Sequence, residues 1–295
     1  PYDAALHDAA GIAMYRSAFD LYGTETPIPS VDPLFEPGGA CAAIRSLLRP
    51  LQRKFDQWWI VGGADEMERD LQPVVQRRGC RAFKLKLPAR DNGDDAKRTA
   101  EVFRAAVRFG AKHPRLTVDT NEANADADSV KDYLERLFAL DADAFAAVEY
   151  LEQPTSRDLA HAAFDWRPVT KLKPVLLDEG LTGMESLQVA KRQGWSGFAL
   201  KTCKGHSIAL VAAAWARRNR MPVSLQDLTN PGLSAIHAAL FAGCIETLNG
   251  VELNSPQYTP AANREWLPRL DGLLSPSGGV HTLEGVNPVG LGSLS

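Results

Sequence analysis

The 295-residue sequence has few cysteines, no surplus of positive charge and no long apolar run, and each absence excludes a class of protein. Four cysteines without a CxxC pair are too sparse for a disulfide framework, which suits a reducing compartment. The net charge of −3 leaves no basic surplus to neutralise phosphates or anionic lipid. No apolar stretch approaches the roughly 20 residues of a membrane span, and the first residues lack a secretory signal pattern. We therefore expect a cytoplasmic protein that binds neither nucleic acid nor membrane.

From about residue 56 onward, short strand-like runs alternate with longer segments of helical pattern. Eight runs are rich in β-branched and aromatic residues. They begin at Trp58, Ala82, Leu116, Val148, Pro174, Gly197, Pro222 and Gly250. Eight strand–helix units in a row fit a closed barrel better than an open sheet, because parallel strands need helices on both faces. The sequence therefore predicts an α/β fold of the (β/α)8 TIM-barrel type.

The predicted barrel covers residues 56–254, and more irregular segments flank it on both sides. Residues 1–55 are interpreted as an opening helix and a linker that lead into the barrel. Residues 255–295 are interpreted as a turn-rich tail. Neither flank has the pattern of an independently folding domain.

Ionisable side chains recur at the carboxyl ends of the predicted strands, where barrel enzymes place their chemistry. Lys84 and Lys86 share one side of the second strand, since side chains alternate along a strand. Successive strands, each about one strand–helix unit further on, then end at Asp119, Glu152, Asp178 and Lys201. The other polar side chains at these ends are Asn121, Glu179, Lys204, Asp227, Glu252 and Asn254. Neighbouring strands would thus deliver lysine, three acids and lysine to one pocket.

Three converging carboxylates repel one another unless a cation lies among them. An all-oxygen ligand set without His or Cys favours a hard divalent ion, Mg²⁺ or in its place Mn²⁺. Asp119, Glu152 and Asp178 are therefore the predicted metal ligands. Lysines beside such a centre are predicted general bases, because nearby positive charge favours the neutral amine that a base requires. This pattern indicates removal of the proton next to a carboxylate, since the resulting enolate needs a metal and fixed cations.

Together these motifs resemble the enolase superfamily, specifically its muconate-lactonizing (cycloisomerase) subgroup. FKLKL resembles the subgroup's KxK element, VDTNEA, EYLEQP and LLDEG resemble its three metal-ligand strands, and ALKTCK resembles its lysine-bearing sixth strand. The resemblance implies that Lys86 is an acid/base assisted electrostatically by Lys84, that Lys201 is the acid/base on the opposite face, and that Mg²⁺ stabilises an enolate. The mandelate-racemase subgroup is disfavoured, because it would have a His–Asp pair where this sequence has Gln226, Asp227 and Lys201.

The resemblance also implies an N-terminal α+β capping domain, of which the sequence shows no trace. We expect this domain to be absent from the chain, with the tail packing on the barrel or returning toward the missing cap.

The predicted function is a Mg²⁺-dependent isomerase or lyase that acts on a small-molecule carboxylate. Its enolate would lead to racemisation or epimerisation, cycloisomerisation or elimination. Asn121, Glu179, Lys204, Asp227, Glu252 and Asn254 are the expected substrate-binding residues, although Glu252 and Asn254 fit the polar layer of a barrel equally well. A Schiff-base class I aldolase that uses Lys201 and a catalytically inactive barrel scaffold stay open as alternatives, as does assembly into a homo-oligomer.

Overall fold

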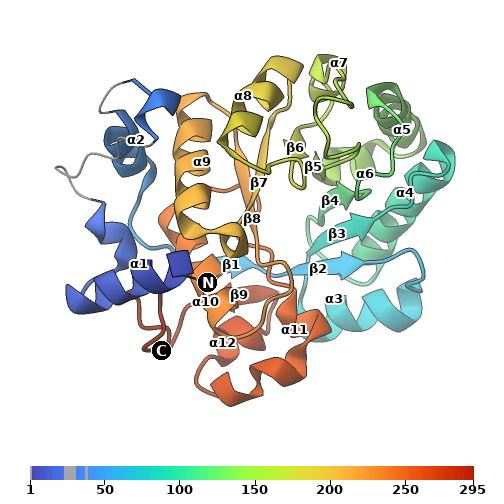
Figure 1. Cartoon of the computed structure of the whole chain (residues 1–295). Helices are drawn as coiled ribbons and strands as arrows, with labels where there is room; N and C mark the ends of the chain where they lie inside the picture. Colours follow the sequence, from blue (N-terminus) through green and yellow to red (C-terminus); the bar gives the residue numbers. More distant parts are fainter. Residues whose placement is uncertain (1, 23–30, 37–38) are drawn as a thin grey trace. The chain divides into compact units, whose positions relative to one another are not determined.

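The computed structural model describes residues 2–22, 31–36 and 39–295, which form two compact units (Figure 1). The first, here called the strand unit, comprises Gln57–Ala199 and Ser277–Gly279. The second, here called the terminal unit, comprises Pro1–Asp56, Leu200–Pro276 and Val280–Ser295. The predicted division into residues 1–55, 56–254 and 255–295 stays a prediction.

Parallel strands form the centre of the strand unit, and each pairs with the next one along the chain. They are β2 (Trp58–Val61), β3 (Ala82–Lys86), β4 (Arg115–Asp119), β5 (Val148–Glu152), β6 (Val175–Leu177) and β7 (Gly197–Lys201), whose last two residues belong to the terminal unit. Every residue of β6 and β7 is buried. This pattern is typical of parallel strands that are covered on both faces.

Helices connect these strands, as the alternating pattern predicts. They are η3 (Met67–Leu71), α3 (Gln72–Arg78), α4 (Asn92–Arg108), α5 (Ala127–Leu140), α6 (Ala142–Ala147), α7 (Arg167–Thr170) and α8 (Met184–Gln193). Aspartate caps begin the two longest, because the Asp91 carboxylate accepts from the N–H of Asp94 and the Asp126 carboxylate from that of Ser129. The two helices, α4 and α5, pack against each other (Figure 1).

The terminal unit combines helices with three strands. Its elements are α1 (Tyr2–Ala13), η1 (Ala18–Leu21), η2 (Asp32–Leu34), α2 (Gly39–Leu47), β1 (Lys54–Asp56), η4 (Thr202–Lys204), α9 (His206–Arg218), β8 (Val223–Gln226), α10 (Leu233–Cys244), α11 (Ser255–Tyr258), η5 (Pro260–Trp266), α12 (Asp271–Leu274) and β9 (Val280–Thr282). Strand β1 pairs antiparallel with β9, whereas β8 continues the parallel order after β7. Residues 1, 23–30 and 37–38 of the predicted opening segment lie outside the described residues.

The eighth predicted strand, from Gly250, is reduced to an isolated bridge between Glu252 and Gln226. The Asn249 side chain contributes to this, since its Oδ1 accepts from the Leu225 N–H at 3.0 Å, whereas the Leu225 carbonyl accepts both from Asn249 Nδ2 and from the Glu252 backbone N–H, each at 2.9 Å. A side chain thus takes a position that a neighbouring strand would use, and Gly250, with φ +68°, turns the backbone out of the extended conformation. Within the described residues the parallel sheet has seven strands, and its closure into an eight-stranded barrel stays a prediction.

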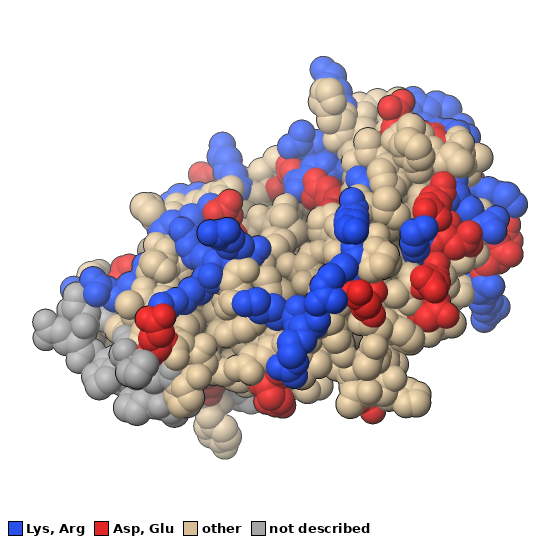
Figure 2. All heavy atoms as spheres, turned by 90° about the horizontal axis from the view of Figure 1, so that it is seen from above, with Lys and Arg blue, Asp and Glu red and all other residues tan. Residues whose placement is uncertain are grey.

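The described residues include no helix that is both long and apolar enough to cross a membrane. On the face shown in Figure 2, Lys and Arg side chains occur together with Asp and Glu side chains. Charges of both signs at the surface agree with the small net charge of the chain.

Candidate active site

Three of the predicted site residues lie at one level of the sheet in the strand unit. Lys86 is the register partner of Asp119, and Asp119 is the register partner of Glu152. They end β3, β4 and β5. Register partners in a parallel sheet project to the same face, and Lys84 shares that face because it lies two residues before Lys86. The structure therefore brings Lys84, Lys86, Asp119 and Glu152 together.

Lys84 provides positive charge inside this group. Its Nζ lies 3.0 Å from both carboxylate oxygens of Glu152 and 3.1 Å from Oδ2 of Asp119. All three side chains are almost completely buried, with no more than 3% of any of them exposed. Buried carboxylates need a partner of opposite charge, because burial in a medium of low dielectric constant disfavours the charged form. Lys84 meets that need for both acids at once.

Asp119 has partners on both of its carboxylate oxygens. Its Oδ2 also accepts from Lys86 Nζ, and its Oδ1 accepts from the Asn121 backbone N–H at 2.8 Å. Burial favours the neutral acid, but the ammonium groups of Lys84 and Lys86 outweigh this effect, and the pKa of Asp119 lies below its ordinary value. Asp119 is thus an anionic carboxylate at neutral pH, as a metal ligand must be.

The loops that follow β4 and β6 carry the next predicted residues. Asp178 is buried directly after β6, and the side-chain amide of Asn121 donates to Oε1 of Glu179 at 3.4 Å. Asn121 and Glu122 both have left-handed backbones, with φ +47° and +70°. Asparagine adopts this conformation fairly readily, but it is strained for glutamate, and such strained residues concentrate at functional sites. The strain in this loop agrees with a functional role for the end of β4.

The chemistry of these side chains fits a divalent ion. Asp119, Glu152 and Asp178 offer only carboxylate oxygens, which Mg²⁺ prefers, and all three are buried at or just beyond the ends of successive strands. Within residues 2–22, 31–36 and 39–295, however, no three His, Cys, Asp or Glu side chains are arranged to hold a metal ion. Instead the Lys84 amine lies between the carboxylates of Asp119 and Glu152. Those two carboxylates thus have a cation between them already, although it is an amine and not a metal.

The remaining predicted residues belong to the terminal unit. Lys201 ends β7 and is buried, whereas Lys204, in η4, is exposed. Asp227, Glu252 and Asn254 form a buried network, because the Asn254 side-chain amide donates to Oε1 of Glu252 at 2.9 Å and its backbone N–H donates to Oδ2 of Asp227 at 3.1 Å. The structure thus brings these three predicted binding residues together.

Asp227 has an unusual affinity for its proton. Burial and, to a smaller extent, the nearby Glu252 carboxylate raise its pKa to about 7, although backbone N–H groups of Thr229 and Asn254 donate to it and act in the opposite direction. At neutral pH this carboxyl is therefore partly protonated, and in that form it can donate a hydrogen bond.

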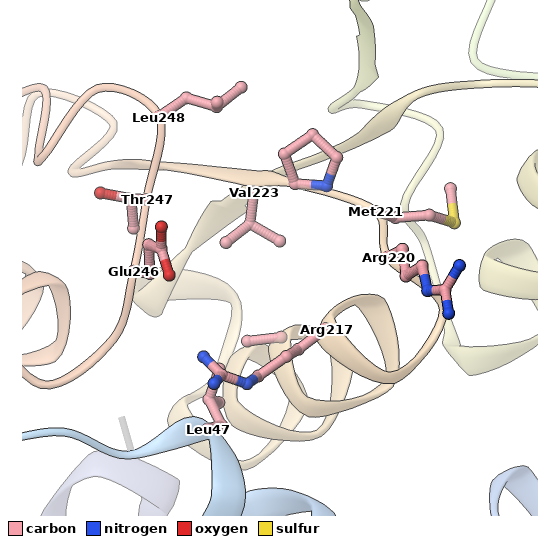
Figure 3. Close-up of a pocket in the computed structure, with 10 residues that line it drawn as sticks. Leu47, Arg217, Arg220, Met221, Val223, Glu246, Thr247 and Leu248 are labelled. Atoms are coloured by element: carbon pink, nitrogen blue, oxygen red, sulfur yellow. The ribbon is translucent and has the colours of Figure 1, made fainter.

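A pocket of about 480 Å³ lies elsewhere in the terminal unit (Figure 3). Arg217, Arg220, Val223 and Glu246 contribute to its wall. Val223 begins β8, whereas Asp227 directly follows the other end of that strand. The pocket therefore lies at the amino end of β8 and is separate from the carboxyl-end residues considered above.

The prediction missed Gln153, which directly follows Glu152 and is fully buried. Its side chain bonds to backbone groups of Thr155, Asp178 and Gly180. The sequence shows only that a polar residue lies between Glu152 and Pro154. This pattern does not indicate which groups Gln153 bonds to.

Comparison with known proteins shows the family of this chain. The model of the enolase C-terminal domain-like family matches residues 66–280. This is most of the sequence, so the chain belongs to that family. No curated protein matches the sequence.

Solved structures share the fold at low sequence identity. A muconate lactonizing enzyme from Klebsiella pneumoniae is 22% identical with a TM-score of 0.59, over 85% of this chain and 61% of that one. A dipeptide epimerase from Enterococcus faecalis V583 is 16% identical with a TM-score of 0.62, over 86% and 64% of the two chains. An L-Ala-D/L-Glu epimerase is 20% identical with a TM-score of 0.59, over 87% and 67%. The chain thus spans less than two thirds of the first two relatives, and the likeness concerns the fold.

Proposed function

We propose that this chain carries the catalytic residues of a Mg²⁺-dependent isomerase or lyase that removes the proton next to a carboxylate. Within its family we assign it to the muconate-lactonizing subgroup, since FKLKL and ALKTCK carry the lysines of that pattern. The observation that supports the proposal best is the group at the ends of β3, β4 and β5, where buried Lys84 lies between Asp119 and Glu152 and Lys86 bonds to Asp119.

Lys86 is the proposed base. Of the two lysines on its strand it is the more accessible, with 36% of its side chain exposed against 3% for Lys84. In its neutral form it takes the proton from the α-carbon: the C–H bond breaks, an N–H bond forms at Nζ, and the electron pair moves into the substrate carboxylate to give an enolate. Because Lys84 is buried between two acids, it stays in place as a fixed cation that favours this negative charge.

Lys201 is the proposed second acid/base. A proton delivered from Lys201 to the opposite face of the enolate inverts the carbon, which is racemisation or epimerisation. A leaving group on the next carbon instead departs with the electron pair, which is elimination, and the reverse of such a step closes a ring. Asn121, Glu179, Lys204, Asp227, Glu252 and Asn254 are proposed to bind and orient the rest of the substrate.

Asp119, Glu152 and Asp178 would hold the divalent ion, Mg²⁺ or Mn²⁺. When bound, the ion supplies positive charge that makes a doubly charged enolate attainable.

Proton exchange with solvent tests the proposal. The chain is incubated in D₂O with Mg²⁺ and a panel of acyl-amino acids, dipeptides and sugar acids, and deuterium at the α-carbon is measured by NMR. We expect exchange for at least one substrate, and a loss of roughly 10²- to 10⁴-fold in Lys86→Ala and in Lys201→Ala, since that is the usual contribution of a general base. Exchange that persists in Lys86→Ala would refute its role, and no exchange across the panel would favour the inactive scaffold.

Borohydride trapping separates the proposal from the aldolase alternative. A class I aldolase forms an imine between its lysine and a keto acid, which borohydride reduces to a stable adduct. We expect no adduct at Lys201, because proton abstraction forms no covalent bond to the enzyme. An adduct at this residue would instead support the aldolase.

A further inference from the structure

Gln153 bonds to all three loops that follow the acid-bearing strands β4, β5 and β6. Its backbone carbonyl accepts from the Glu122 N–H at 2.9 Å, in the loop after β4. Its side-chain Nε2 donates to the Thr155 carbonyl at 2.9 Å, in the loop after β5. Its side-chain Oε1 accepts from the N–H groups of Asp178 and Gly180, both at 2.9 Å, in the loop after β6.

The side-chain oxygen of Gln153 is fully used by these bonds. A carbonyl oxygen has two lone pairs, and here each accepts from one backbone N–H group. Gln153 is 0% exposed, so water cannot replace a lost bond without entering the interior. One of its two partners is the backbone of Asp178 itself, which fixes the point at which that side chain leaves β6.

The backbone of Gln153 also has a strained conformation. Its φ of +33° is left-handed, which glutamine adopts rarely. Glutamine in this conformation persists only where the surroundings determine it, and such residues cluster at functional sites. Here the hydrogen bonds to the three loops hold Gln153 in this conformation.

We infer that Gln153 is a positioning residue that sets the spacing of Asp119, Glu152 and Asp178 by tying together the ends of their strands. This inference rests on the proposed function, because that function gives the three acids a common task. Partners that orient ligand side chains influence metal affinity although they do not touch the metal.

Gln57 offers a matched control. It is a second buried glutamine of the strand unit, 1% exposed, and its Oε1 accepts no hydrogen bond from the described residues. Replacement of either glutamine by methionine keeps the length of the side chain and removes its amide. Only Gln153→Met removes bonds to the acid-bearing loops.

Two measurements on the full chain test the inference. Amide hydrogen exchange reports the loop after β6 without any metal, and electron paramagnetic resonance of free Mn²⁺ reports metal affinity. We expect Gln153→Met to speed exchange at Asp178 and Gly180 and to weaken Mn²⁺ binding by roughly 10- to 100-fold. Gln57→Met should change neither.

The outcomes separate this inference from the proposed function. If the unmodified chain binds no Mn²⁺, the proposed function fails, whereas the exchange rates still show whether Gln153 holds the loop. If the unmodified chain binds Mn²⁺ and Gln153→Met binds it equally well, the inference is overturned. Equal losses in Gln153→Met and Gln57→Met would also overturn it, since they would indicate general loosening.

A second variant tests the inference if Gln153→Met does not fold. Gln153→Glu keeps an oxygen that can accept from Asp178 and Gly180, and because burial favours the neutral acid, its other oxygen carries a proton that can donate to Thr155. We expect the two amides to stay protected in this variant. Rapid exchange at both would contradict the assigned role of Oε1.

Discussion

Two groups of buried acids in this molecule differ in how their charge is compensated. In the strand unit, the Lys84 amine lies between Asp119 and Glu152, and the pKa of Asp119 is lowered despite its burial. In the terminal unit, Asp227 accepts from backbone N–H groups near the Glu252 carboxylate, and burial raises its pKa to about 7. Asp119 ends β4 and Asp227 directly follows β8, so a place at the end of a strand does not by itself set the protonation state. A neighbouring ammonium group keeps Asp119 anionic. Asp227 instead accepts from uncharged backbone N–H groups within the described part of the chain, so burial favours its protonated form.

The largest change in stability should follow removal of the Lys84 ammonium group, which compensates the acids of the strand unit. Lys84→Met leaves Asp119 and Glu152 buried without that charge. Loss of one partner from a buried ion pair costs about 3–5 kcal/mol, and we expect a decrease of this size in the free energy of unfolding, measured with urea. Lys97→Met is the control, because the Lys97–Asp94 pair is exposed and exposed ion pairs contribute little to stability. Equal stability of the two variants would show that Lys84 does not compensate the acids.

The pH dependence of stability tests the protonation of Asp227 in the terminal unit. The pKa of Asp227 is about 7 in the folded chain, against an ordinary value of 3.8. Between these values the unfolded chain loses the proton that the folded chain retains, so the free energy of unfolding falls as the pH rises from about 4 to 7. The full difference amounts to roughly 4 kcal/mol.

Asp227→Asn isolates this contribution. Asp119 acts in the opposite direction, since its lowered pKa contributes stability that is lost as the pH falls below its ordinary value. The difference between the unmodified chain and Asp227→Asn, measured by urea unfolding from pH 4 to pH 8, removes the Asp119 effect. A difference that does not change with pH would mean that Asp227 ionises normally.

The smallest change in stability should come from the exposed Glu122–Arg157 ion pair. It is the reference for the effects expected at Lys84 and Asp227. Glu122 accepts from the Arg157 guanidinium and backbone N–H, and the guanidinium hydrogen bond is the main reason why its pKa is lowered. Because 58% of the Arg157 side chain is exposed, we expect Arg157→Ala to destabilise the chain far less than Lys84→Met does, and less still in 1 M NaCl. A loss as large as that of Lys84→Met would contradict the importance that we assign to burial.

The sequence predicts the strands and their charged ends because both signals are local. Alternation along a strand puts Lys84 beside Lys86, and buried β-branched runs mark where the strands begin. The start of α5 is marked less clearly, since Asp126 is its cap and the backbone N–H of Ser129 donates to it. Both residues are good caps, so the pattern does not choose between them.

Features that depend on a neighbouring strand could not be predicted. GVELN has the composition of a strand, and its Glu252 N–H does donate to the Leu225 carbonyl, but the Leu225 N–H donates to the Asn249 side chain instead of to a strand backbone. The role of Gln153 depends on N–H groups some 25 residues further along the chain, at Asp178 and beyond. The position of Lys84 between two acids likewise follows from the register of β3, β4 and β5 and not from the spacing of charges within one strand.

Isothermal titration of the chain with Mg²⁺ tests the central claim most directly. We predict one ion per chain, bound by Asp119, Glu152 and Asp178. Asp119→Asn, Glu152→Gln and Asp178→Asn should each weaken binding by at least about tenfold, whereas Asp227→Asn should leave it unchanged. Binding that survives all three substitutions, or that depends on Asp227 instead, would contradict the account.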